Sequence, residues 1–216
     1  MRCRKGKQQT TSAVVDIGLS FLIVFMIKQY NIILGSGSPR RKELLSGLDL
    51  HFRVLVRDGV KETYPEDLPA KEVARYIAEE KASAYTDLLS GDTMVITADT
   101  IVVCDNTILG KPRDINDAVR MLKMLSGKTH QVITGVCIST KEKKKAFSVN
   151  TNVTFKRLLD TEIDYYVSKY KPLDKAGAYG IQEWIGHVGV EHLDGSYFNV
   201  MGLPVQRIYQ TLAEEF

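Results

Sequence analysis

The chain has 216 residues, of which 44% are hydrophobic and 25% charged, and its formal net charge is +3 at pH 7. This balance is typical of a soluble folded protein and argues against extensive disorder. So small a net charge gives no indication of nucleic-acid binding, which usually needs a concentrated basic face. Three cysteines without a CxxC pair argue against a disulfide framework or a zinc knuckle, and they predict a reducing, cytoplasmic location.

The N-terminus combines basic residues with an apolar run at residues 17–27, an arrangement that resembles the start of a signal peptide. The run is shorter than the roughly 20 apolar residues that span a bilayer, and Lys28 follows it in place of a small-residue cleavage site. We therefore interpret residues 1–25 as an extension outside the fold, with Met26 as the natural start and residues 26–216 as one domain. A membrane anchor would depend on this run alone and is not expected.

The rest of the chain alternates strand-like and helix-like segments. Strands are expected at residues 31–34, 52–56, 93–104, 130–139 and 146–158. Helices are expected at residues 39–47, 69–89, 115–125, 162–169 and 205–212. Residues 174–195 are rich in glycine and are expected to form an irregular functional loop. Early alternation followed by a hairpin predicts an α/β fold with a mixed sheet.

The segment GSGSPRRKELL joins the first expected strand to the first expected helix at residues 35–45. Ser38 suits the N-cap and Pro39 the first turn, so backbone N–H groups and the positive end of the helix dipole would meet at one point. Arg40 and Arg41 add donors suited to phosphate. The segment matches neither the P-loop nor the GxGxxG pattern, and a tight turn with solvated arginines is the alternative interpretation.

Three further positions suggest chemistry. Asp99 interrupts an apolar strand, where burial of a carboxylate is costly unless the group binds a cation or is hydrogen-bonded. It is therefore a candidate metal ligand or proton acceptor. The alternative interpretation is a structural aspartate whose hydrogen bonds are satisfied. Lys111 lies between Gly110 and Pro112, in a stiff loop that could present it to a phosphate. The alternative interpretation is an ordinary exposed lysine. Gln182 ends a glycine-spaced loop, and its amide can pair with the edge of a base.

Together these segments resemble the Maf family of nucleoside-triphosphate pyrophosphatases. The match covers residues 32–204 through ILGSGSPRRKELL, ITADTIVVCDNTILGKP, DAVRMLKMLSGKTHQVITGV and KAGAYGIQ, in that order. The resemblance implies an elongated mixed sheet flanked by helices, with two lobes and a central cleft, related to the inosine-triphosphatase fold. It also implies hydrolysis of a nucleoside triphosphate to the monophosphate and pyrophosphate with a divalent metal, Mg or Mn.

The resemblance assigns roles by motif. Asp99 would be the proton acceptor and, with Glu62, a ligand of the metal. Glu62, Lys81 and Lys111 would complete the catalytic set. The first loop would bind phosphate through Ser36, Arg41 and Glu43.

Three positions differ between subgroups of the family, and here they are Arg40, Thr100 and Gln182. This combination resembles the subgroup that acts on dTTP and UTP. Gly35 departs mildly from the alanine that is common in the first loop. A homodimer is compatible with the resemblance, and neither a nucleic-acid nor a membrane partner is implied. The competing interpretation is a nucleotide-binding regulator of septum formation without turnover, which could dispense with the catalytic set.

Overall fold

The computed structural model describes residues 27, 29–60 and 62–216, so the expected extension over residues 1–25 lies outside the described part. A seven-stranded sheet has the order β2-β1-β3-β5-β6-β7, with β4 paired to β3. β1 runs parallel to β2 and β3, and the remaining pairs are antiparallel. The expected mixed α/β sheet is therefore confirmed. The strands are β1 (Asn31–Leu34), β2 (Phe52–Val54), β3 (Thr93–Cys104), β4 (Thr107–Leu109), β5 (Thr129–Ser139), β6 (Lys144–Phe155) and β7 (Val190–Asp194).

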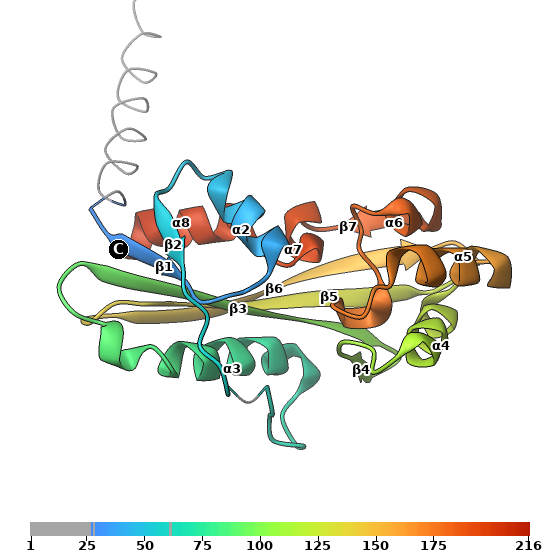
Figure 1. Cartoon of the computed structure of the whole chain (residues 1–216), viewed down its shortest axis with the longest axis horizontal. Coiled ribbons are helices and arrows are strands. Elements are labelled where there is room, and N and C mark those ends of the chain that lie inside the picture. Colours follow the sequence, from blue (N-terminus) through green and yellow to red (C-terminus); the bar gives the residue numbers. More distant parts are fainter. Residues whose placement is uncertain (1–26, 28, 61) are drawn as a thin grey trace, which may run out of the picture.

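Helices cover both faces of the sheet. Figure 1 shows α3 on one face of the long central strands and α2, α7 and α8 on the other, while α4, α5 and α6 gather around the far end. No helix in the described ranges is long and apolar enough to cross a membrane. The helices are α2 (Pro39–Ser46), α3 (Ala70–Ser83), α4 (Ile115–Leu125), α5 (Asp160–Tyr170), α6 (Trp184–Gly189), α7 (Tyr197–Met201) and α8 (Val205–Glu215), with short 3-10 turns η1 (Thr86–Leu88) and η2 (Ala176–Ala178).

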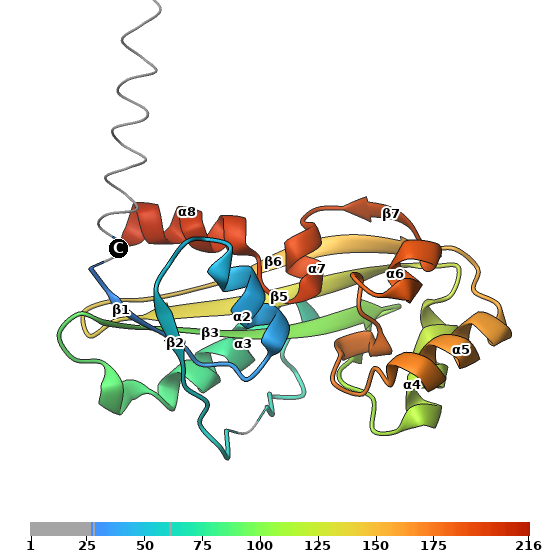
Figure 2. The same ribbon diagram turned by 45° about the horizontal axis from the view of Figure 1, so that its top comes forward.

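The hydrophobic core is divided along the length of the sheet. One cluster packs β1, β3 and β5 against α2 and α8, and smaller clusters lie beneath α3. A separate large cluster joins α4, α5 and α6 to the far ends of the long strands. Figure 2 shows the two groups of helices at opposite ends of strands that run through both. The expected two-lobe organisation is thus confirmed.

The backbone of α3 packs unusually close to the sheet at Gly135 of β5. A Cβ atom at this position would lie 2.2 Å from the carbonyl carbon and oxygen of Ala74. Gly135 is the direct cross-strand partner of Asp99 on β3. The absence of a side chain at Gly135 therefore lets α3 lie directly on β5, beside the strand that carries Asp99.

Several expected boundaries were wrong. The helix expected over residues 69–89 ends at Ser83, because Tyr85 turns into the core and its hydroxyl donates to the carbonyl of Leu55 at 2.8 Å. By contrast, β3 spans Thr93–Cys104 as expected, and it continues through Asp99, whose buried carboxylate pairs with Lys81. β6 is shifted toward the N-terminus, at Lys144–Phe155 instead of residues 146–158. The segment 174–195 is not irregular throughout, since it contains η2, α6 and β7.

Candidate active site

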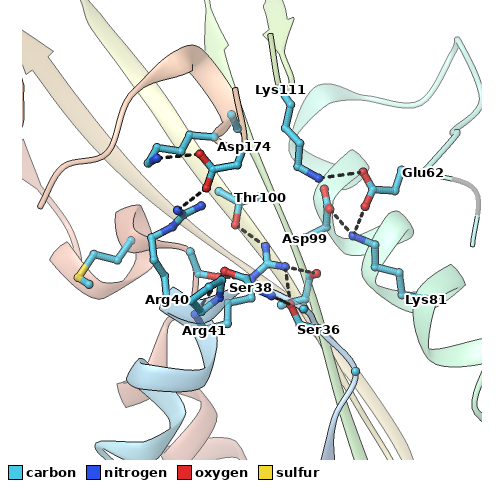
Figure 3. Close-up of a pocket in the computed structure, with 18 of the residues that line it drawn as sticks. Ser36, Ser38, Arg40, Arg41, Glu62, Lys81, Asp99, Thr100, Lys111 and Asp174 are labelled. Atoms are coloured by element: carbon cyan, nitrogen blue, oxygen red, sulfur yellow. Dashed lines mark hydrogen bonds and ion pairs between the residues drawn. The ribbon is translucent and has the colours of Figure 1, made fainter. Parts of the chain in front are cut away.

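A cavity of about 500 Å³ opens between the two lobes. One wall is the loop between β1 and α2, and the opposite wall is the segment 174–182 that follows α5. Asp99 and Thr100 of β3 lie between these walls, with Lys81 of α3 and Lys111 of the loop after β4 to one side (Figure 3). A cavity of this size can hold a ligand of the size of a nucleotide.

The loop between β1 and α2 has the expected geometry. Ser38 is the N-cap of α2, and its hydroxyl accepts from the backbone N–H of Arg41 at 3.4 Å; Pro39 occupies the first turn. Ser36 is buried, and its hydroxyl accepts from the backbone N–H of Ser38 at 3.3 Å. Ser36, Gly37, Ser38 and Arg40 all line the cavity, so the serine hydroxyls and the backbone of this loop are potential anion-binding groups.

The close packing around Gly35 explains why this chain has a glycine at that position. A Cβ atom there would lie 2.9 Å from both the ring of Tyr85 and Cγ2 of Thr97. Tyr85 lines the cavity, and its hydroxyl also accepts from the backbone N–H of Arg57 at 3.2 Å. The glycine thus makes room for the tyrosine that supports the segment after β2.

The charged centre of the cavity is Lys81, which lies between two carboxylates. Its Nζ is 2.7 Å from Oδ1 of Asp99 and 2.7 Å from Oε1 of Glu62. Lys111 approaches the other oxygen of Glu62 at 3.6 Å. Asp99 is 8% exposed, so Lys81 supplies the positive charge that its burial requires. Figure 3 shows these four side chains converging from separate elements.

The electrostatics of Glu62 follow from this arrangement. Partial burial alone would raise the pKa of Glu62, but the hydrogen bond and charge of Lys81, with the charge of Lys111, hold it below its usual value. Glu62 therefore remains ionised at neutral pH beside the cavity.

The guanidinium group of Arg41 forms hydrogen bonds within the protein. Its Nε donates to the carbonyl of Gly202 at 2.8 Å, one terminal nitrogen donates to the carbonyl of Ala98 at 2.8 Å, and the other donates to the hydroxyl of Thr100 at 3.1 Å. Burial lowers the pKa of Arg41, and the nearby carboxylate of Asp99 partly offsets this effect. These contacts join α2 to β3 and to the turn after α7, so most of its donors are unavailable to a phosphate.

The three positions expected to set specificity all line the cavity. Arg40 forms an ion pair with Asp174 on the opposite wall at 2.8 Å. Thr100 receives the bond from Arg41, and its hydroxyl is 3.0 Å from that of Thr134. Gln182 has a buried Oε1 atom without a hydrogen-bond partner among the described residues. A buried acceptor of this kind is costly unless a ligand or water satisfies it.

Glu43 is the one expected site residue that the structure does not bring to the cavity. It is exposed on α2 and is absent from the cavity lining. Around the helix axis it lies about 200° from Arg41 but only about 60° from Arg40, which lines the cavity. Its expected role in phosphate binding stays a prediction.

Sequence analysis missed several residues of the far wall. Asp174 and Lys175 line the cavity, and Lys175 is buried between the carboxylates of Asp174 and Glu183, at 2.7 Å and 3.1 Å. Their signal was adjacency to the GAYGIQ segment, since Lys175 opens the motif that contains Gln182. Tyr179 in the same segment is buried, and its hydroxyl is 2.8 Å from Nε2 of His130.

The carboxylates of the cavity fit a metal that is shared with a substrate. No group of three His, Cys, Asp or Glu side chains in the described ranges could hold a metal ion by itself. Glu62 and Asp99 flank the same ammonium group, so the two carboxylates lie close together. Mg²⁺ is commonly held by one or two carboxylates together with the phosphates of a substrate, and this donor set meets that requirement.

The chain is similar to several known proteins. A dTTP/UTP pyrophosphatase from Phocaeicola vulgatus is 58% identical over 186 residues, covering 86% of this chain and 96% of that protein. A dTTP/UTP pyrophosphatase from Porphyromonas gingivalis is 53% identical over 190 residues, with 87% and 96% covered. The solved structure of a HAM1 protein from Coxiella burnetii has a TM-score of 0.43 and 12% identity, with 86% and 99% covered. The family model described as Maf-like protein matches residues 31–215. The chain belongs to the Maf family.

Proposed function

We propose that this protein hydrolyses nucleoside triphosphates, with dTTP and UTP as preferred substrates, to the monophosphate and pyrophosphate. The observation that carries the proposal is the convergence of Glu62, Lys81, Asp99 and Lys111 in one cavity, opposite the loop at the start of α2. The named activity of the relatives supports the same assignment.

Asp99 acts as the proton acceptor in this proposal. Lys81 engages its Oδ1 at 2.7 Å, which fixes the orientation of the carboxylate. Oδ2 then accepts a proton from a water molecule as the oxygen of that water forms a bond to the α-phosphorus. The anhydride bond between the α- and β-phosphates breaks, and pyrophosphate leaves. Proton transfer to a positioned side chain typically contributes about 10²- to 10⁴-fold to a rate.

A divalent metal would be held by Glu62 and Asp99 together with the phosphates, and Mg or Mn suits these ligands. When bound, such an ion supplies positive charge that stabilises the charge developing on the phosphate oxygens. Lys111 has a largely exposed side chain and adds positive charge at the mouth of the cavity. The serine loop and the start of α2 would bind the phosphates through their N–H groups.

The nucleobase of the substrate would lie against the segment 174–182, the wall of the cavity opposite the loop between β1 and α2. The buried Oε1 of Gln182 needs a donor, and the amide offers both a donor and an acceptor to the edge of a pyrimidine. Arg40 and Thr100 are the other two proposed specificity residues, and both face the same cavity.

The test is pyrophosphate release from a panel of ribo- and deoxynucleoside triphosphates, with Mg²⁺ or Mn²⁺ and after chelation. We expect UMP and pyrophosphate from UTP, a higher kcat/KM for dTTP and UTP than for purine nucleotides, and loss of turnover on chelation that either metal restores. Release of orthophosphate and a diphosphate, or equal rates with purines, would contradict the proposal. Binding of UTP without any product would instead support a regulatory role.

A further inference from the structure

A continuous chain of polar contacts links the two walls of the cavity. Arg40 contacts Oδ2 of Asp174 at 2.8 Å, and the other oxygen of Asp174 contacts Nζ of Lys175 at 2.7 Å. Lys175 in turn contacts Oε1 of Glu183 at 3.1 Å. Figure 3 shows the first contact, with Asp174 reaching across to Arg40. Arg40 and Asp174 lie 134 positions apart in the sequence, and the carboxylate of Asp174 contacts both Arg40 and Lys175.

The same chain continues to the backbone beside Gln182. The second oxygen of Glu183 accepts a hydrogen bond from the hydroxyl of Tyr166 on α5. That hydroxyl also accepts from the backbone N–H of Gly180 at 3.0 Å. A Cβ atom at Gly180 would lie 2.9 Å from the carboxyl carbon of Glu183, so the glycine allows the carboxylate to pack against the turn. The hydroxyl of Tyr166 and the carboxylate of Glu183 therefore hold the turn that carries Gln182 in place.

Burial strengthens the inner contacts of this chain, whereas the contact between Arg40 and Asp174 lies near the surface, with the Asp174 side chain 59% exposed. Lys175 is 8% exposed and Tyr166 is fully buried. Burial alone would raise the pKa of Asp174, but the hydrogen bonds from Lys175 and Arg40 lower it to about 2. Burial and the bond to Glu183 raise the pKa of Tyr166, which therefore stays protonated and keeps its donor. Removing the hydroxyl of Tyr166 would leave the buried N–H of Gly180 and the carboxylate of Glu183 without this partner.

We propose that Asp174, Lys175, Glu183 and Tyr166 form a positioning network that sets base selectivity by holding Arg40 and Gln182 in place. The inference rests on the proposed function, because it concerns the pyrimidine preference of the same cavity. Asp174 acts through Arg40, and Tyr166 and Glu183 act through the turn at Gly180. None of them is placed among the groups that hold the metal or accept the proton, so the network governs binding of the base and leaves the chemical step unchanged.

Tyr166→Phe tests the network, because it removes one hydroxyl and keeps the ring that stacks on Tyr170 at 5.0 Å. Tyr165→Phe is the matched control on the same helix, since the hydroxyl of exposed Tyr165 contacts only Lys169 among the described residues. We expect Tyr166→Phe to raise the KM for UTP about tenfold, the effect of one buried hydrogen-bonding group left unpaired, with kcat within about twofold of wild type. Tyr165→Phe should match wild type in both constants.

Asp174→Asn tests the other end of the network. It should lower the preference for UTP over GTP, measured as the ratio of kcat/KM values, because the contact with Arg40 loses its charge. Dissociation constants for a non-hydrolysable UTP analogue, measured by calorimetry, should follow the KM changes in both variants. Unchanged KM and selectivity in folded Tyr166→Phe and Asp174→Asn would overturn the inference and leave the proposed function standing. A wild-type protein that neither binds nor hydrolyses UTP would overturn both.

Discussion

Gly135→Ala should damage the active site from a distance through the packing of α3. The new Cβ would lie 2.2 Å from backbone atoms of Ala74 and 2.3 Å from the backbone nitrogen of Arg75. Ordinary contacts between such atoms are about 3.5–4.0 Å, so α3 must move by about 1.3–1.8 Å or the strand must distort. Backbone atoms cannot rotate away as the end of a side chain can.

This displacement would reach the ammonium group of Lys81. Lys81 projects from α3, and its 2.7 Å bond to Asp99 would open beyond hydrogen-bonding range after a shift of that size. A misplacement of about 1 Å can lower a rate about 10²-fold, and overpacking typically costs about 1–3 kcal/mol. We therefore expect kcat to fall about 10²-fold and the free energy of unfolding to fall by at least about 1 kcal/mol.

Two measurements check this prediction, namely urea unfolding and kcat on UTP below the unfolding transition. Gly110→Ala is the matched control for stability, because a Cβ there has no heavy atom within 4 Å. Wild-type stability together with wild-type kcat in Gly135→Ala would refute the reasoning that close packing of α3 on β5 positions Lys81.

Three further substitutions test other parts of the account. Lys81→Met should lower kcat on UTP at least about 10²-fold in a steady-state assay, because two carboxylates lose their shared counter-charge. Glu43→Gln should leave kcat and KM unchanged, because Glu43 is exposed outside the cavity. Burial lowers the pKa of His130 from 6.5 to about 4, so the unfolded chain binds a proton between these pH values that the folded chain does not. Wild type should therefore lose about 3 kcal/mol of stability from this group as the pH falls from 6.5 to 4, and urea unfolding of His130→Phe should lack that part of the pH dependence.

Local signals in the sequence predict the first part of the fold well. Ser38 and Pro39 mark the start of α2, and Asp114 caps α4 by accepting from the backbone N–H of Asp117 at 2.8 Å. These features act within one helical turn, so the sequence alone reveals them. β7 gave no such signal, because its residues are mostly exposed or partly exposed and it forms only by pairing with β6. Its existence depends on a partner strand far away in the chain.

The candidate site shows the same division. Asp99 and Gln182 stood out locally, because a charge or an amide in a distinctive setting can be recognised from the sequence, whereas Lys81 was assigned only by the family resemblance. Arg41 looked like a phosphate ligand, but the fold directs its donors to carbonyls of β3 and of the turn after α7. Asp174 resembles any loop acid until the fold brings it to Arg40. Partners that are distant in sequence decide what such residues do, and one chain does not display them.

The most direct test of the central claim is the turnover of Asp99→Asn. This change keeps the size and polarity of the side chain but removes its capacity to take a proton from water. Asp105→Asn is the matched control, because Asp105 directly follows β3, is exposed, and pairs with Lys128 outside the cavity. The account predicts that pyrophosphate release from UTP falls about 10²- to 10⁴-fold in Asp99→Asn and stays at the wild-type rate in Asp105→Asn. Wild-type turnover by folded Asp99→Asn would contradict it.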